Sequence, residues 1–178
     1  MLRLFTVLIV SLGLVSNASA SLFGDHEIFD AALNNDSETV QQFLINGENV
    51  NIRDKAKSPL IVKAAEAGST AVVELLLENN VSIDLSDRYG NTALIQAASK
   101  GFEDVVTLLL DKGAKPNKEN QQGETAVIKT AQSGTLGVLK LLIQAGADLS
   151  LTDFTGRSAL DHAIESRNRP VQRLLEKQ

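Results

Sequence analysis

The sequence contains no cysteine among its 178 residues. This absence excludes disulfide bonds, thiolate metal sites, cysteine nucleophiles and an N-terminus of the acylated lipoprotein type. Tryptophan is also missing, and aromatic residues make up only 4% of the chain. The core must therefore be built mostly from Ala, Val, Leu and Ile, and such small side chains suit closely packed helices.

Basic residues are fewer than acidic ones, so the chain has a formal net charge of −5. Phosphate backbones are bound by basic faces. We therefore do not expect nucleic acid to be a partner of this protein.

The first twenty residues have the composition of a secretory signal. Arg3 supplies a positive start, residues 4–15 are mostly apolar, and Ala18-Ser19-Ala20 fits a cleavage site, which predicts cleavage after Ala20. A helix of twelve residues spans roughly 18 Å, less than a hydrocarbon core of about 30 Å. An uncleaved anchor and a buried core helix are the alternatives. No other segment approaches membrane-spanning length, so no membrane contact is expected after cleavage.

A repeat of 33 residues runs through the rest of the chain. Two columns with this spacing consist of six Gly, two Asn and one Arg: Gly47, Asn80, Gly113 and Gly146 in the first, and Asn35, Gly68, Gly101, Gly134 and Arg167 in the second. Gly and Asn are the residues that best accept the left-handed conformation at helix ends. Each repeat is therefore predicted to hold two helices, each ended by a left-handed residue.

The third repeat shows the predicted layout most clearly. Residues 87–91 form a turn with Asp first and Gly fourth, and Thr92 is a plausible N-cap. Helices are predicted over residues 93–100 and 103–111. The second of these is too apolar for a surface helix, so it must be covered by the neighbouring repeats.

These residues resemble the ankyrin-repeat family. The matching positions in the third repeat are Asp87, Gly90, Thr92, Leu94, Ala97, Ala98, Gly101, Val105, Val106, Leu108, Leu109, Gly113 and Ala114. The resemblance implies an all-α solenoid of about five helix-turn-helix repeats with projecting turns. The expected ranges are 21–53 as a cap, 54–86, 87–119, 120–152, and 153–178 as a second cap.

Some repeats depart from this pattern. The second contains Ser58-Pro59-Leu60 one position early, so its turn is predicted to be one residue shorter and its helix one residue longer at the start. In the first repeat Gln41 and Gln42 are expected to face water, and Pro170 is expected in the first turn of the last helix. Such polar ends keep an array soluble.

Candidate catalytic groups are scarce. His26 and His162, the only two histidines, lie in opposite terminal repeats and match no metal-binding pattern. Both are predicted to be solvated, at the surface or at a helix end. We expect no catalytic residue, cofactor or metal, and an enzyme is the remote alternative.

The resemblance implies protein binding through the turns and the late positions of the first helices. The candidate contact residues are Arg88, Tyr89, Asn91, Lys100, Gln121, Gln122, Glu124, Phe154 and Arg157. Tyr89 and Phe154 are the most prominent, since aromatic residues and Arg often anchor interfaces. The alternative is that each ring only packs onto its neighbouring turn.

The signal and the repeats together predict a monomeric, non-catalytic binding protein in the periplasm or outside the cell. By size and layout the chain resembles exported bacterial ankyrin proteins linked with peroxide defence, which implies such a setting by resemblance alone. A secreted effector that binds a host protein is the alternative. The sequence does not identify the partner.

Overall fold

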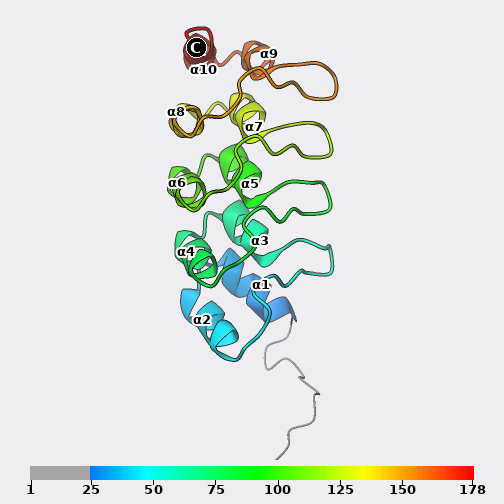
Figure 1. Cartoon of the computed structure of the whole chain (residues 1–178), viewed down its shortest axis with the longest axis vertical. Coiled ribbons are helices and arrows are strands. Elements are labelled where there is room, and N and C mark those ends of the chain that lie inside the picture. The colour runs from blue at the N-terminus through cyan, green and yellow to red at the C-terminus, as the bar shows by residue number, and fades with distance from the viewer. Residues whose placement is uncertain (1–24) are drawn as a thin grey trace, which may run out of the picture.

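The structure is a computed structural model that describes residues 25–178; the predicted signal segment and its cleavage site after Ala20 lie outside these residues. Residues 25–178 form ten helices: α1 (Asp25–Leu33), α2 (Ser37–Ile45), α3 (Leu60–Ala67), α4 (Thr70–Glu78), α5 (Ala93–Lys100), α6 (Glu103–Asp111), α7 (Ala126–Ser133), α8 (Leu136–Gln144), α9 (Ala159–Glu165) and α10 (Arg169–Leu175). The odd-numbered helices stack in an inner layer beside the projecting turns, and the even-numbered helices form an outer layer (Figure 1). The predicted all-α solenoid is confirmed.

The helices of the third repeat begin and end where the sequence predicted. The Thr92 hydroxyl accepts a hydrogen bond from the Ile95 N–H at 3.3 Å and so caps the start of α5. Gly101 ends α5 with a φ of 81°. Helices α5 and α6 cover residues 93–100 and 103–111, so both predictions are confirmed.

Every residue of the two repeating columns is left-handed. All six glycines and both asparagines have positive φ, and so does Arg167, with a φ of 56°. The predicted left-handed helix ends are therefore confirmed. In the last repeat Arg167 has the same left-handed conformation. The stacked helix pairs decide the conformation, because an arginine alone would not favour it.

The prediction for the second repeat was wrong. Helix α3 begins at Leu60, which is in register with the start of α5, and the preceding turn keeps its full length. Lys57 takes a left-handed φ of 64° where Gly90 lies in the third repeat, so no residue is lost from the turn. Pro59 is extended at the N-cap position, with a φ of −66°. Proline suits that position because it has no N–H to leave unpaired.

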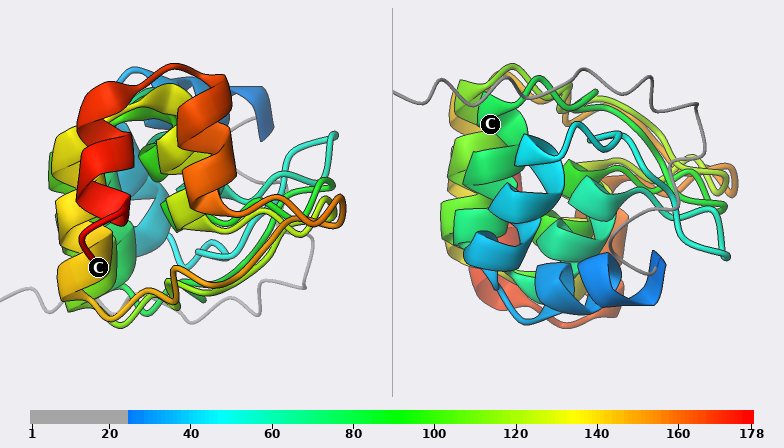
Figure 2. Two further views of the ribbon diagram at one scale, coloured as in Figure 1. Left: turned by 90° about the horizontal axis from the view of Figure 1, so that it is seen from above. Right: turned by 90° about the horizontal axis from the view of Figure 1, so that it is seen from below.

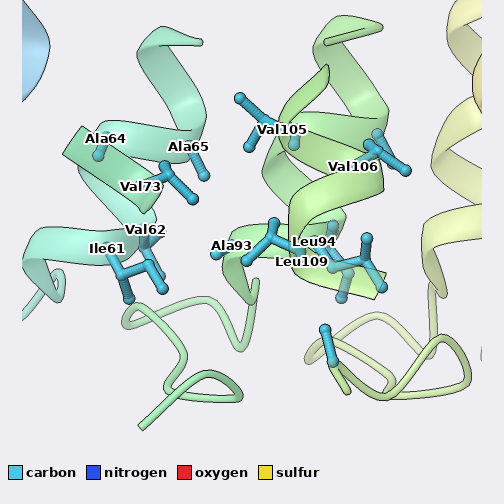
Figure 3. Packing of buried hydrophobic residues seen from close by; sticks show 14 of the residues in the cluster. Ile61, Val62, Ala64, Ala65, Val73, Ala93, Leu94, Val105, Val106 and Leu109 are labelled. Atoms are coloured by element: carbon cyan, nitrogen blue, oxygen red, sulfur yellow. The ribbon is translucent and has the colours of Figure 1, made fainter. Parts of the chain in front are cut away.

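The core is a continuous row of small and branched side chains between repeats (Figure 3). In α6, Val105, Val106 and Leu109 are completely buried, as the apolar character of this helix required. Helix α6 packs against its own partner α5 and against α4 and α8 on either side. Alanines such as Ala64 and Ala97, also fully buried, let the inner helices lie close together.

Two further local predictions concern the terminal repeats. On α2 the side chains of Gln41 and Gln42 are exposed, and Pro170 lies in the first turn of α10, both as predicted. Within residues 25–178, no helix combines the length and the apolar composition needed to cross a membrane.

Candidate protein-binding face

The turns between repeats project from the same side of the molecule and form a row (Figure 2). We call residues 54–58, 87–91, 120–124 and 153–157 the turn row. Backbone hydrogen bonds connect its later members: the Gln121 N–H donates to the Tyr89 carbonyl at 2.9 Å, and the Phe154 N–H donates to the Gln122 carbonyl at 2.9 Å. The last three turns of the row are therefore joined to one another by backbone hydrogen bonds.

One side chain organises each of the last three turns. The Asp87 carboxylate accepts the backbone N–H groups of Tyr89 and Asn91 at 2.8 and 2.9 Å. In the next turn the Asn120 side-chain carbonyl accepts the N–H groups of Gln122 and Glu124, both at 2.9 Å. An amide oxygen thus replaces a carboxylate oxygen without changing the shape of the turn.

A groove lies between the turn row and the inner helices. Its larger part is a hollow of about 460 Å³ in the third and fourth repeats, lined by Glu66, Tyr89, Asn91, Ile95, Gln96, Ser99, Lys100, Asn120, Gln122, Lys129, Gln132 and Ser133. A smaller hollow of about 140 Å³ lies towards the second repeat, lined by Ala56, Ser58, Lys63, Glu66, Asp87, Arg88, Tyr89 and Gln96. Tyr89, Glu66 and Gln96 line both hollows, so the two form one groove.

Tyr89 is half-exposed between the two hollows. Its side chain keeps 49% of its surface open, and the Arg88 guanidinium carbon lies 4.6 Å from the centre of its ring. The Arg88 side chain also donates to the Tyr89 hydroxyl at 2.5 Å. The arginine thus holds the ring in place from one side, which leaves the ring in position for a contact.

Phe154 is 73% exposed but lies apart from the groove lining. Its ring covers Gly123 in the preceding turn: a Cβ added at Gly123 would lie 2.6 Å from the ring. The alternative noted from the sequence, local packing on a neighbouring turn, therefore describes the geometry of Phe154 better than that of Tyr89.

Glu124 and Asn91 are tied into a polar network. The Glu124 carboxylate accepts hydrogen bonds from the side chains of Asn120 and Gln132 at 2.9 and 2.8 Å and lies 3.4 Å from the Lys129 ammonium. Burial alone would raise the pKa of Glu124, but these hydrogen bonds and this charge hold it below its usual range. The Asn120 amide also donates to the Asn91 side chain at 2.9 Å. The side chains of Asn91 and Glu124, both predicted contact residues, thus already make hydrogen bonds within the protein.

The fifth repeat corrects the prediction that both histidines are solvated. His26 is exposed and lies 2.8 Å from Asp30, but His162 keeps only 4% of its surface open. The His162 Nε2 lies 2.9 Å from the buried Asp153 carboxylate, which gives the ring a partner inside the protein. Arg157 also lies 3.3 Å from Asp153, and its guanidinium contacts Glu165.

The same interactions govern the ionisation of Asp153. A hydrogen bond from the Thr155 hydroxyl is the largest influence, and it acts with the Arg157 and Thr155 N–H groups and His162. Together they hold the pKa of Asp153 well below its usual range despite burial.

A buried His–Asp pair can also orient a catalytic base. The other ring nitrogen of His162 lies near the Gln132 amide at 3.4 Å and the Glu165 carboxylate at 4.0 Å. Within residues 25–178 no cluster of three metal-ligating side chains occurs. The His162–Asp153 pair joins α9 to the turn before it.

The structure brings only part of the predicted contact set together. Tyr89, Asn91, Lys100 and Gln122 line the larger hollow and Arg88 lines the smaller one, while the Gln121 side chain donates to the Arg88 carbonyl at 2.9 Å. The groove also includes residues that were not predicted: Ile95, Gln96, Asn120 and Lys129. Helix periodicity could have indicated Gln96, because it lies one turn before Lys100, which was predicted as a late helix position.

Paired helices, a turn row and a groove on one side define a helical-repeat protein that works by binding. The family model for ankyrin repeats in three copies matches residues 28–120 and 112–178. The chain belongs to the ankyrin-repeat family. Ankyrin repeats mediate binding to other proteins and are generally non-catalytic. A search of curated proteins found no match to this chain.

Proposed function

We propose that this chain is an exported, monomeric and non-catalytic protein that holds another protein in the groove beside its turn row, in the periplasm or outside the cell. The observation that carries this proposal is the half-exposed Tyr89, which lies where the two hollows meet. Tyrosine offers a large contact area with few rotatable bonds and is enriched among residues that dominate binding energy.

Export is supported by the signal-like composition of residues 1–20. A role in peroxide defence is consistent with the composition of the rest of the chain: cysteine is absent, and the only methionine is Met1. A chain cleaved after Ala20 would hold no sulfur for peroxide to oxidise. Such a protein would keep its binding face intact while its surroundings are oxidised.

The proposal is tested by capturing the partner with the purified protein from a periplasmic extract of its own organism. Wild-type protein should retain one partner in stoichiometric amount. Tyr89→Ala should lower the affinity for that partner about tenfold to a hundredfold, because truncated anchor residues typically cost 2 kcal/mol or more. Its unfolding temperature should stay close to that of the wild type.

Ile45→Ala is the matched control, since Ile45 is 67% exposed on the outer helix α2. Equal losses from Tyr89→Ala and Ile45→Ala would refute the groove as the binding face, and repeated recovery of no partner would refute the binding role. A partner found only in host-cell extracts would instead support the secreted effector.

A further inference from the structure

The two sides of the first three repeats differ in charge. The outer helices α2, α4 and α6 contain six carboxylates and no Lys or Arg: Glu38, Glu74, Glu78, Glu103, Asp104 and Asp111. The opposite edge, in the turn row and the groove of the second and third repeats, carries Lys55, Lys57, Arg88 and Lys100. All four of these basic residues are exposed.

These four cations have no acidic partner in the part of the chain that the structure describes. Lys55, Lys57 and Lys100 make no side-chain hydrogen bond there either, and Arg88 donates only to the Tyr89 hydroxyl. Their charge is therefore available to a ligand.

The carboxylates on the same face are already engaged. Glu66 lies 3.0 Å from the Lys63 ammonium, and Asp87 accepts two backbone N–H groups of its turn. Glu124 is held by the polar network described above, and Asp54 accepts the Ser58 N–H at 2.8 Å. Each of these four carboxylates thus has a hydrogen-bond or ionic partner inside the fold, whereas the four cations have no acidic partner among the described residues.

The larger hollow is also rich in amides. The side chains of Gln96, Gln122 and Gln132 line it together with Asn91 and Asn120. Asn91 and Asn120 are paired within the fold. Within residues 25–178 the Gln122 side chain makes no hydrogen bond, and the amides of Gln96 and Gln132 donate while their side-chain carbonyls stay unpaired. These groups can pair with an extended peptide backbone, beside the free cations at the edge of the groove.

We infer that the segment that this groove takes is an extended, acidic stretch of the partner protein, lying across the second to fourth repeats over Tyr89. This inference rests on the proposed function and adds the chemical class of the partner. Carboxylates spaced along the segment would meet Lys55, Arg88 and Lys100, and its backbone would meet the amides. Complementary charge of this kind raises the association rate and fixes the register of binding.

A protein segment fits this face better than an anionic membrane does. Membrane-binding proteins present their cations to a surface through amphipathic helices or polybasic clusters. Here a half-exposed tyrosine and several amides line a hollow beside the cations, so part of this face is concave and suits a single chain segment better than a planar bilayer surface.

The test uses the purified full chain and labelled synthetic peptides of about twelve residues, which span roughly 40 Å when extended. Every second residue is Glu in the first peptide, Gln in the second and Lys in the third. Only the Glu peptide should bind, and NMR amide shifts should change at Tyr89, Lys100 and Gln122. Its affinity should fall steeply as salt rises towards about 0.5 M, because these charges are exposed.

Single lysine substitutions show which surface of the protein binds the Glu peptide. Lys55→Gln and Lys100→Gln should each weaken binding of the Glu peptide about fivefold. Lys140→Gln is the matched control, since it removes the same charge from an exposed position on the outer helix α8 and should change nothing.

The opposite results are equally clear. If the Gln peptide binds as well as the Glu peptide, or if no peptide shifts the groove signals, the acidic preference is wrong. Binding of the natural partner is measured separately, with the Tyr89→Ala variant. The proposed function would therefore still stand. If vesicles with one quarter anionic lipid bind through these lysines and the peptides do not, the face is a membrane-binding surface.

Discussion

Gly101 and Gly113 have nearly the same backbone, with φ values of 81° and 88°, but very different surroundings. A Cβ added at Gly101 would lie 2.8 Å from the Thr135 hydroxyl of the next repeat, whereas nothing lies within 4 Å of one added at Gly113. Glycine is thus needed at Gly113 for conformation alone and at Gly101 for conformation and space.

The contrast extends to whole columns. Gly68 and Gly134 face Phe102 and Asn168 of the following repeats, while Gly47 and Gly146 face open space. The column at the end of the inner helices therefore forms part of the interface between repeats, and the column at the end of the outer helices does not. A change in the column at the end of the inner helices should disturb stacking, and a change in the column at the end of the outer helices should only strain one turn.

The largest expected effect comes from alanine in the covered column. Gly101→Ala should destabilise the protein by about 2–4 kcal/mol, since left-handed strain and overpacking add. Gly113→Ala should cost only the strain, about 1–2 kcal/mol. Urea unfolding of both variants measures the difference. If both variants lose the same free energy of unfolding, the Thr135 side chain moves aside without cost and the two columns are equivalent.

A moderate effect in the opposite direction is expected at Lys57, a left-handed residue without the usual glycine. Lys57→Gly should stabilise the protein by about 1 kcal/mol, because the strained φ of 64° becomes unstrained. Lys55→Gly is the control, since it removes the same charge without relieving a positive φ, and it should not stabilise. A fall in unfolding temperature for Lys57→Gly would show that the second turn needs the lysine for its shape.

The smallest effect concerns the turn of residues 153–157, where nothing lies within 4 Å of a Cβ added at Gly156. Asp153 holds this turn, and its pKa in the folded protein is lowered. A lowered pKa adds stability above the unfolded value of about 3.9, and this stability is lost as pH falls below it. Asp153→Asn should keep the turn, as Asn120 does in the fourth repeat, but lose this pH dependence.

The measurement is the unfolding temperature of both proteins between about pH 7 and pH 2.5. The advantage of the wild type over Asp153→Asn should shrink below about pH 4. A difference that stays constant over this range would show that the ionisation of Asp153 does not couple to folding.

Much of the fold could be predicted from the sequence because the repeat shows the same constraint several times. A single glycine such as Gly101 would not be enough to predict a helix end. Nine positions in two columns, occupied by Gly, Asn and one Arg, indicate the same left-handed backbone conformation in every repeat. The limits of α5 and α6 followed from Thr92, the glycine at the end of α5, and the apolar run between residues 105 and 110. These features are local, so spacing was sufficient to find them.

The errors arose where a residue depends on its three-dimensional neighbours. Lys57 and Pro59 suggested a shifted turn, but the stacked neighbours impose the common geometry on both. His162 was expected to be solvated. Its hydrogen-bond partner Asp153 lies nine residues earlier in the sequence, in the preceding turn. Spacing along the chain could not predict that these side chains would meet.

The candidate site was predicted less completely than the fold. Tyr89 and Lys100 were found because turns and late helix positions are exposed in any such repeat. The commitment of Glu124 to Asn120 and Gln132 was missed, because it depends on an Asn where the other turns have Asp. Only coordinates show which exposed polar groups are already paired.

The most direct test of the groove as the binding face is site-specific photo-crosslinking in living cells. A photoreactive amino acid at Gln122, in the groove, should attach covalently to one partner protein, and the same group at Lys140, on the outer helix α8, should not. Crosslinking at Lys140 without crosslinking at Gln122 would contradict the account.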